Sequence, residues 1–204
     1  DNHLRGFYSY GRIMHLMTSV NLLPQLTLIL GGARSGKSSY AQNAAILSAK
    51  KVLYVATAEA GDDEMTERIA VHRASRPQDW STLEVPCNVG EAVSRYVEHN
   101  HSEVILLDCL TLLISNVIGV LPEETTSETY QKAVEAEIEI LLAAVNRLKI
   151  PWLVVSNEVG LGLVPPYALG RIYRDVLGWA NQRMAAQADR VIFMVSGIPM
   201  NLKG

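Results

Sequence analysis

Short apolar runs alternate along the chain with longer segments in which apolar residues recur every three or four positions. Four of the five runs are almost uninterrupted, as expected of central strands that are buried on both faces. The alternation predicts an α/β fold, a mostly parallel sheet with helices on both faces. The predicted strands are Leu26–Leu30, Val52–Ala56, Val104–Leu107, Trp152–Ser156 and Val191–Val195.

Three of the longer segments have features of helices. From Thr126 to Leu148 the apolar residues fall on one face, which predicts an amphipathic helix packed on the sheet. The segment Asp62 to Arg73 begins with acidic residues and ends with basic ones, an arrangement that suits the helix dipole. Tyr167 to Ala188 follows two prolines and is predicted as a helix, although Gly170 and Gly178 weaken this prediction.

Length and composition limit the possible functions. The 204 residues suffice for one α/β domain, predicted at residues 26–204, whereas residues 1–25 lack periodicity and are predicted to be a poorly ordered leader or tag-like extension. A formal net charge of −3 gives no general attraction to nucleic acid. Polar residues interrupt the longest apolar stretch, so we expect no membrane span. Two cysteines without metal-ligand spacing favour a cytoplasmic protein.

The strongest functional motif is GGARSGKS, which satisfies the P-loop pattern G-x-x-x-x-G-K-[ST] between a predicted strand and the predicted helix Ser39 to Ala49. We expect its backbone N–H groups to bind a polyphosphate, Lys37 to reach the β- and γ-phosphates, and Ser38 to bind Mg²⁺. A glycine-rich turn with a chance lysine is the alternative. The predicted phosphate-binding residues are Gly31, Gly32, Ala33, Arg34, Ser35, Gly36, Lys37 and Ser38.

A carboxylate follows the third predicted strand. Asp108 comes directly after a buried apolar run, where P-loop enzymes carry a second metal contact. We therefore predict that Asp108 binds Mg²⁺ together with Ser38. The alternative is that Asp108 caps a helix beginning at Leu110, and the two roles are compatible.

His72 lies near the end of the predicted helix Asp62 to Arg73 and has arginines beside it in the sequence. A neutral imidazole at His72 can attack phosphorus, and Arg73 and Arg76 can neutralise phosphate charge. However, Met65 and Ile69 share one helical face with His72, a pattern that favours a packed or helix-capping histidine. The residues themselves leave both interpretations open.

Taken together, these segments resemble the bifunctional adenosylcobinamide kinase and adenosylcobinamide-phosphate guanylyltransferase family of cobalamin biosynthesis. The resemblance covers about residues 26–202 and implies a P-loop NTPase fold of the RecA-like type. The segments that carry it are GGARSGKS at 31–38, VLYVAT at 52–57, DEM at 63–65, HRASRP at 72–77, NEVG at 157–160 and VSG at 195–197.

The resemblance implies two reactions. ATP or GTP first phosphorylates adenosylcobinamide; GTP then donates GMP to adenosylcobinamide phosphate through a guanylyl-histidine, giving adenosylcobinamide-GDP and pyrophosphate. It implies that His72 and Lys37 are catalytic, and it favours a homo-oligomer, a trimer. The further nucleotide or metal contacts that it implies are Ala56, Thr57, Ala58, Arg73, Ala74, Ser75, Arg76, Glu84 and Asp108.

Two other functions fit the same residues. One is a P-loop kinase of another small metabolite, and the other is a nucleotide-dependent switch; His72 is structural in both. Glu158, after the fourth predicted strand, is a candidate contact for base, substrate or Mg²⁺, or belongs to a polar turn. The apolar loop Leu161 to Pro166 is a candidate contact for the corrinoid or for a neighbouring subunit.

Overall fold

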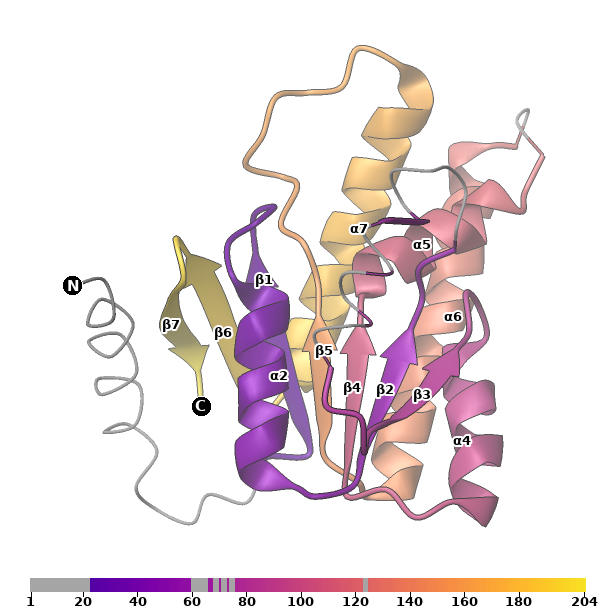
Figure 1. Ribbon diagram of the computed structural model, residues 1–204. Coiled ribbons are helices and arrows are strands. Elements are labelled where there is room, and N and C mark those ends of the chain that lie inside the picture. Colours follow the sequence, from indigo (N-terminus) through magenta and orange to yellow (C-terminus); the bar gives the residue numbers. More distant parts are fainter. Residues whose placement is uncertain (1–22, 60–65, 68–69, 71–72, 74–75, 123–124) are drawn as a thin grey trace.

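The computed structural model describes residues 23–59, 66–67, 70, 73, 76–122 and 125–204. Within these residues, seven strands form one sheet in the order β3-β2-β4-β5-β1-β6-β7 (Figure 1). All neighbouring strands are parallel except β6 and β7, which are antiparallel. The strands are β1 (Leu26–Gly31), β2 (Val52–Ala56), β3 (Ser81–Glu84), β4 (Val104–Asp108), β5 (Trp152–Val155), β6 (Arg190–Val195) and β7 (Ile198–Lys203).

Helices cover both faces of the sheet, but unequally (Figure 1). Helix α2 (Lys37–Ser48) packs on one face, in a core with Ile29 and Tyr54. The other face carries α4 (Val89–His99), α5 (Leu110–Gly119), α6 (Ser127–Leu148) and α7 (Ala168–Gln187). This arrangement confirms the predicted α/β fold with a mostly parallel sheet and helices on both faces.

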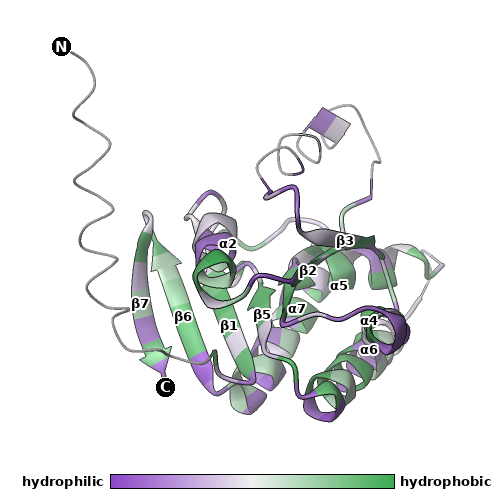
Figure 2. Cartoon of the chain, turned by 60° about the horizontal axis from the view of Figure 1, so that its bottom comes forward, coloured by the Kyte–Doolittle hydropathy of each residue, from purple (hydrophilic) through white to green (hydrophobic). Residues whose placement is uncertain are grey.

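The central strands lie between two apolar cores. All residues of β1, β2 and β5 are buried, and along β1 Leu28 and Leu30 face the core with α7 while Ile29 faces α2. Because both faces are covered, apolar residues are favoured at consecutive positions. Figure 2 shows the result as strongly hydrophobic central strands and a more polar β7.

The five predicted strands agree with observed strands to within one residue at each end. Two strands and one helix had no counterpart among the predictions: β3, β7 and α4. Both strands lie at the edges of the sheet and are mostly exposed. An exposed edge strand has no need of a continuous apolar run, so its sequence lacks the signal that identified the other strands.

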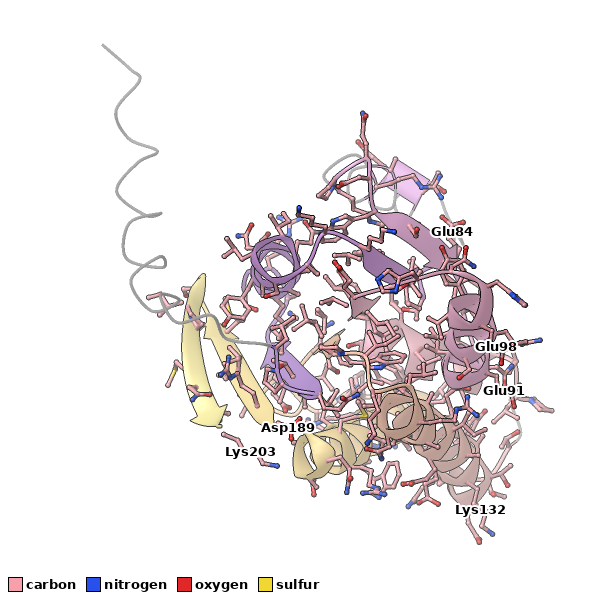
Figure 3. All side chains as sticks on the ribbon, turned by 90° about the horizontal axis from the view of Figure 1, so that it is seen from below. Glu84, Glu91, Glu98, Lys132, Asp189 and Lys203 are labelled. Carbon is pink, nitrogen blue, oxygen red and sulfur yellow. The ribbon has the colours of Figure 1, made fainter. Side chains whose placement is uncertain are left out.

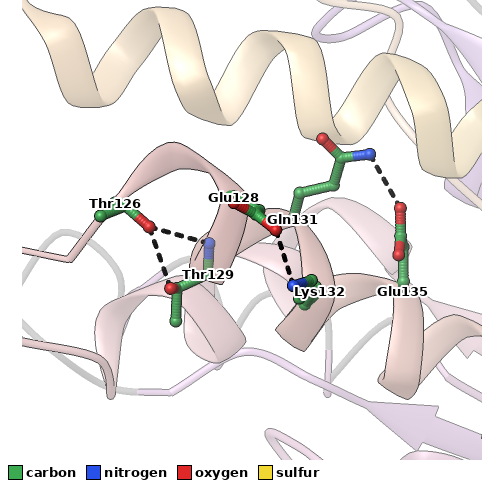
Figure 4. Close-up of polar contacts among 6 residues, drawn as sticks. All are labelled: Thr126, Glu128, Thr129, Gln131, Lys132 and Glu135. Atoms are coloured by element: carbon green, nitrogen blue, oxygen red, sulfur yellow. Dashed lines mark hydrogen bonds and ion pairs between the residues drawn. The ribbon is translucent and has the colours of Figure 1, made fainter.

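The predicted amphipathic helix is α6, which begins one residue later than expected. Thr126 is its N-cap, and its side chain accepts a hydrogen bond from the backbone N–H of Thr129 at 3.2 Å (Figure 4). Glu128 and Lys132, four residues apart on the exposed surface, lie 2.7 Å from each other. A side-chain cap of this kind satisfies an N–H that has no partner within the helix.

The other helix predictions have different outcomes. Helix α7 continues through both Gly170 and Gly178. Of the predicted helix Asp62 to Arg73, residues 66, 67, 70 and 73 are described and helical, and the rest of the segment lies outside the described residues. In the part of the chain that is described, no helix is both long and apolar enough to cross a membrane.

Candidate active site

The segment Gly31 to Ser38 forms the turn between β1 and α2, and steric contacts require glycine at two of its positions. Gly31 has a φ of 150°, and a Cβ there would lie 2.5 Å from the carbonyl oxygen of Met194. Gly36, the N-cap residue of α2, has a φ of 95°, and a Cβ there would lie 3.3 Å from the Cα of Gly197. A side chain at residue 31 would therefore displace the backbone, and residue 36 has a left-handed conformation that glycine adopts without strain.

Two distant segments hold the P-loop through backbone hydrogen bonds. The N–H of Glu158 donates to the carbonyl oxygen of Gly31 at 3.1 Å, and the N–H of Gly197 donates to that of Ser35 at 2.9 Å. Within the loop, the N–H of Ser35 donates to Gly32 at 3.3 Å. The NEVG and VSG segments that carry the family resemblance thus meet at the predicted phosphate site.

Lys37 lies inside the loop. Its side chain is only 7% exposed, and Nζ donates to the carbonyl oxygen of Gly32 at 2.5 Å. Burial lowers the pKa of Lys37 from its ordinary value, and the nearby Cys109 and Asp108 side chains oppose this shift. A buried ammonium beside a carboxylate and carbonyl oxygens is a suitable partner for phosphate oxygens.

The carboxyl ends of the parallel strands together form one edge of the sheet, which lies next to the P-loop and runs across the strands. Ala56, the last residue of β2, pairs with Glu84 of β3 on one side and with Asp108 of β4 on the other. The half-buried Ala58 follows on the same edge. This is the edge at which doubly wound sheets bind ligands.

Thr57 connects two strands at this edge. Its hydroxyl donates to the carbonyl oxygen of Cys109 at 2.7 Å and accepts from the N–H of Cys109 at 2.9 Å. The residue is fully buried. Thr57 therefore ties the end of β2 to the start of α5 at the nucleotide site that the resemblance implies.

Asp108 is half-buried and accepts a hydrogen bond at Oδ2 from the hydroxyl of Tyr54 at 2.8 Å. The N-cap residue of α5 is Cys109, so the interpretation of Asp108 as the helix cap is wrong. Strand β4 continues through Asp108, one residue beyond the apolar run, so Asp108 belongs to the strand. Its carboxylate is close enough to Lys37 to act on the pKa of that amine.

Two arginines of the predicted nucleotide site contact described residues. The guanidinium of Arg73 donates to Oε1 of Glu84, and both side chains are more than half exposed; Figure 3 shows Glu84 at the rim of the molecule. The guanidinium carbon of Arg76 lies 3.6 Å from the centre of the Tyr54 ring. His72, Ala74 and Ser75 lie outside the described residues.

The chemistry of the side chains fits the metal that the P-loop motif implies. Ser38 offers a hydroxyl and Asp108 a carboxylate, the hard oxygen ligands that Mg²⁺ prefers. Among the described residues, no group of three or more His, Cys, Asp or Glu side chains could hold a metal ion. In nucleotide sites Mg²⁺ usually takes its other ligands from phosphates and water.

A buried polar network behind β5 is absent from the sequence predictions. Ser156 donates to Asn181 of α7 at 2.7 Å, and the amide of Asn181 donates to the carbonyl oxygen of Asn157 at 3.0 Å. The N–H of Asn157 donates to the hydroxyl of Thr111 at 2.8 Å. The network fixes the start of the NEVG segment and so the backbone of Glu158 that binds the P-loop.

A pocket of about 480 Å³ is lined by residues of β1, of the NEVG segment and of α7. Its lining includes Leu30, Glu158, Arg174 and Trp179. Oε1 of Glu158 accepts from the N–H of Gly160 at 2.6 Å, which is the polar turn considered as one alternative for this residue. In the same turn, Arg174 donates to the carbonyl oxygen of Gly160 at 2.5 Å.

Comparison with known proteins gives a consistent result. The family described as "Cobinamide kinase / cobinamide phosphate guanyltransferase" matches residues 27–202. The bifunctional adenosylcobalamin biosynthesis protein CobP of Pseudomonas aeruginosa is 45% identical over 177 residues, which is 87% of this chain and 96% of the relative. The corresponding CobU protein of Escherichia coli K12 is 40% identical over 183 residues, with 87% of this chain and 99% of the relative covered. A RadB recombinase crystal structure has a TM-score of 0.45 at 15% identity, covering 85% of this chain and 76% of that one.

Proposed function

Because the chain belongs to the family of cobinamide kinases and cobinamide phosphate guanyltransferases, we propose that it catalyses both reactions. It phosphorylates adenosylcobinamide with ATP or GTP. It then transfers GMP from GTP to adenosylcobinamide phosphate, which gives adenosylcobinamide-GDP and pyrophosphate. The observation that best supports this proposal is the meeting of the NEVG and VSG segments at the P-loop, through the N–H groups of Glu158 and Gly197.

Both reactions would use one phosphate cradle. The N–H groups of residues 31–38 and the N-terminal end of α2 bind the polyphosphate, and Lys37 exchanges the carbonyl oxygen of Gly32 for the β- and γ-phosphates. Ser38 and Asp108 would hold Mg²⁺, which lowers the negative charge around the phosphates. In the kinase step, the acceptor hydroxyl attacks the γ-phosphorus and a nucleoside diphosphate leaves.

The guanylyl step would use His72 as nucleophile. The imidazole attacks the α-phosphorus of GTP and pyrophosphate leaves, with GMP bound to a ring nitrogen. A phosphate oxygen of adenosylcobinamide phosphate then attacks the same phosphorus and releases the histidine. Arg73 and Arg76 would neutralise phosphate charge during both displacements.

The other nucleotide contacts of the proposed site come from the resemblance. They are Ala56, Thr57, Ala58, Ala74, Ser75 and Glu84. The chain would act in the cytoplasm as a homo-oligomer, a trimer, with residues 26–204 as one catalytic domain after the extension 1–25. These features stay predictions.

The test of the proposed function uses GTP labelled at the α-phosphate. After incubation and denaturation, we expect label on the protein that is labile in acid and stable in alkali, as expected of a phosphoramidate. His72→Ala should remove the label. His99→Ala is the matched control, because His99 is an exposed histidine at the end of helix α4, and this variant should keep the label.

The same experiment separates the alternatives. Label on the His72→Ala variant would remove His72 from the mechanism. An unlabelled wild-type protein that still phosphorylates a small acceptor would be a simple kinase. A protein that binds nucleotide and transfers neither group would be the nucleotide-dependent switch.

A further inference from the structure

Tyr54 is a polar exception within β2. The other four residues of this strand are Val, Leu, Val and Ala, and Tyr54 is only 2% exposed. Its ring belongs to the core on the α2 face of the sheet. A hydroxyl buried this deeply costs stability unless it finds a hydrogen-bond partner.

The register of the sheet directs this hydroxyl to the predicted metal ligand. Tyr54 pairs with Leu106 of β4, so Asp108 lies two residues further along the neighbouring strand on the same face. A tyrosine is long enough to reach such a diagonal neighbour, and the phenol donates to Oδ2 of Asp108 at 2.8 Å. This hydrogen bond restrains the orientation of the carboxylate.

The hydroxyl of Tyr54 is the donor in this contact, because a carboxylate oxygen only accepts. Burial raises the pKa of Tyr54 far above its ordinary value, and the nearby charge of Asp108 raises it further. The hydrogen bond to Asp108 is charge-assisted, because a neutral O–H donates to a carboxylate.

The face of the same ring carries Arg76. The guanidinium carbon lies 3.6 Å from the ring centre, and the Trp80 ring lies 6.4 Å from the Tyr54 ring, centroid to centroid, at an angle of 30°. The Nε atom of Arg76 is buried and has no hydrogen-bond partner among the described residues. The cation–π contact with Tyr54 is thus one restraint on this guanidinium.

We propose that Tyr54 is a positioning residue that serves both half-reactions. Its hydroxyl holds the Asp108 carboxylate in the orientation that the Mg²⁺–nucleotide complex requires, and its ring holds Arg76, which follows the proposed nucleophile His72 by four residues in the sequence. This inference rests on the proposed function, since it assumes that Asp108 and Arg76 act on a nucleotide. Tyr54 itself would touch neither phosphate nor metal. It contacts Asp108, the proposed metal ligand, and Arg76, the proposed phosphate contact.

The test measures nucleotide binding without turnover. The probe is the α,β-methylene analogue of GTP, because a P–C bond replaces the bond that guanylyl transfer breaks. Its Kd is measured by calorimetry with saturating Mg²⁺ and with EDTA. In Tyr54→Phe we expect the Kd in EDTA to stay within about twofold of wild type and the tightening by Mg²⁺ to fall about tenfold, the effect of losing one hydrogen bond to a charged group.

Tyr130→Phe is the matched control. Tyr130 is also 2% exposed, and its hydroxyl donates to the carbonyl oxygen of Pro122 at 3.0 Å at the start of α6. The chemical change and the burial are the same, but the lost hydrogen bond is remote from the P-loop. This variant should bind the analogue like wild type under both conditions, even if its melting temperature falls.

A double-mutant cycle with Asp108→Asn decides how Tyr54 acts. If Tyr54 works through Asp108, the pair Tyr54→Phe and Asp108→Asn should lower the tightening by Mg²⁺ no further than Asp108→Asn alone. Additive losses would overturn the proposal. So would an unchanged response to Mg²⁺ in Tyr54→Phe, or an equal weakening with and without Mg²⁺, which would indicate a general packing effect.

The ring has a separate test. Tyr54→Phe keeps a face for Arg76 and loses only the hydroxyl that serves both steps, so the ratio of its guanylylation rate to its phosphorylation rate should stay within about threefold of the wild-type ratio. Tyr54→Leu removes that face and should lower guanylylation about tenfold more than phosphorylation. Equal losses in both steps would refute this part. A wild-type protein that does not bind the analogue would instead refute the proposed function itself.

Discussion

The two parts of the site that would handle nucleotide are built in different ways. The P-loop is held by the main chain: backbone hydrogen bonds from Glu158 and Gly197, and glycines at positions where a Cβ does not fit. Arg73 and Arg76, which follow the predicted nucleophile in the sequence, are instead held by side chains. Arg73 pairs with an exposed carboxylate, and Arg76 stacks on an aromatic ring. Main-chain restraint gives a rigid cradle, whereas the exposed ion pair of Arg73 can be exchanged for contacts with a ligand at little cost.

Lys37→Ala should have the largest effect, because both reactions use the same cradle. We expect kcat/KM for phosphorylation and for guanylylation to fall about a hundredfold to a thousandfold, the loss typical of removing one group that stabilises developing charge. Single-turnover assays with labelled GTP measure both steps. Guanylylation at a rate near that of wild type would show that the two steps do not share the cradle.

Gly31→Ala should follow in size and can be compared with Gly32→Ala. A Cβ at residue 31 would lie 2.5 Å from a backbone oxygen, but a Cβ at residue 32 would meet no atom within 4 Å among the described residues. We expect Gly31→Ala to weaken nucleotide binding at least about tenfold and to lower the melting temperature. Gly32→Ala should retain its melting temperature. Equal melting temperatures for the two variants would contradict the proposed steric reason.

Arg76→Lys should separate the two parts of the site. Lysine keeps the charge but loses the flat guanidinium that stacks on Tyr54. We expect guanylylation to fall about tenfold and phosphorylation to change less than about threefold, measured as single-turnover rates at saturating GTP. A larger loss in phosphorylation would mean that Arg76 serves the cradle directly.

Arg73→Ala should have the smallest effect on stability. The ion pair of Arg73 with Glu84 is exposed on both sides, so its loss should change the free energy of unfolding by less than about 1 kcal/mol. Denaturant unfolding of the variant measures this change. A fall in guanylylation without a fall in stability would support a role of Arg73 at the nucleotide, and a large loss of stability would assign it to the fold.

The sequence was sufficient for the central strands and the P-loop, for two separate reasons. Strands such as β2 and β4 are buried on both faces, and burial on both faces leaves a continuous apolar run that is visible without a structure. The phosphate cradle depends on the main chain, and its glycines and lysine follow one another within eight residues. The position of Asp108 at the end of a strand followed from the same pattern.

The edge strands and the partners of the polar side chains could not be predicted in this way. Strand β3 is short and exposed, so no apolar pattern marks it. The alternative that Asp108 caps a helix is wrong, and the pattern gave no sign that its carboxylate accepts from Tyr54 on the neighbouring strand. In the sequence, Tyr54 looks like any other core residue. The role of its hydroxyl becomes visible only when the neighbouring strand and its register are known.

The sequence by itself thus determined which chemistry this protein carries: local patterns of glycine, lysine and apolar residues depend on neighbours in the chain and can be recognised there. Only the tertiary structure decided which groups meet. The order and register of the strands bring Tyr54 to Asp108 and the segments at 158 and 197 to the P-loop. These contacts join residues that are 54 to more than 100 positions apart, and such pairings arise from the packing of the whole sheet.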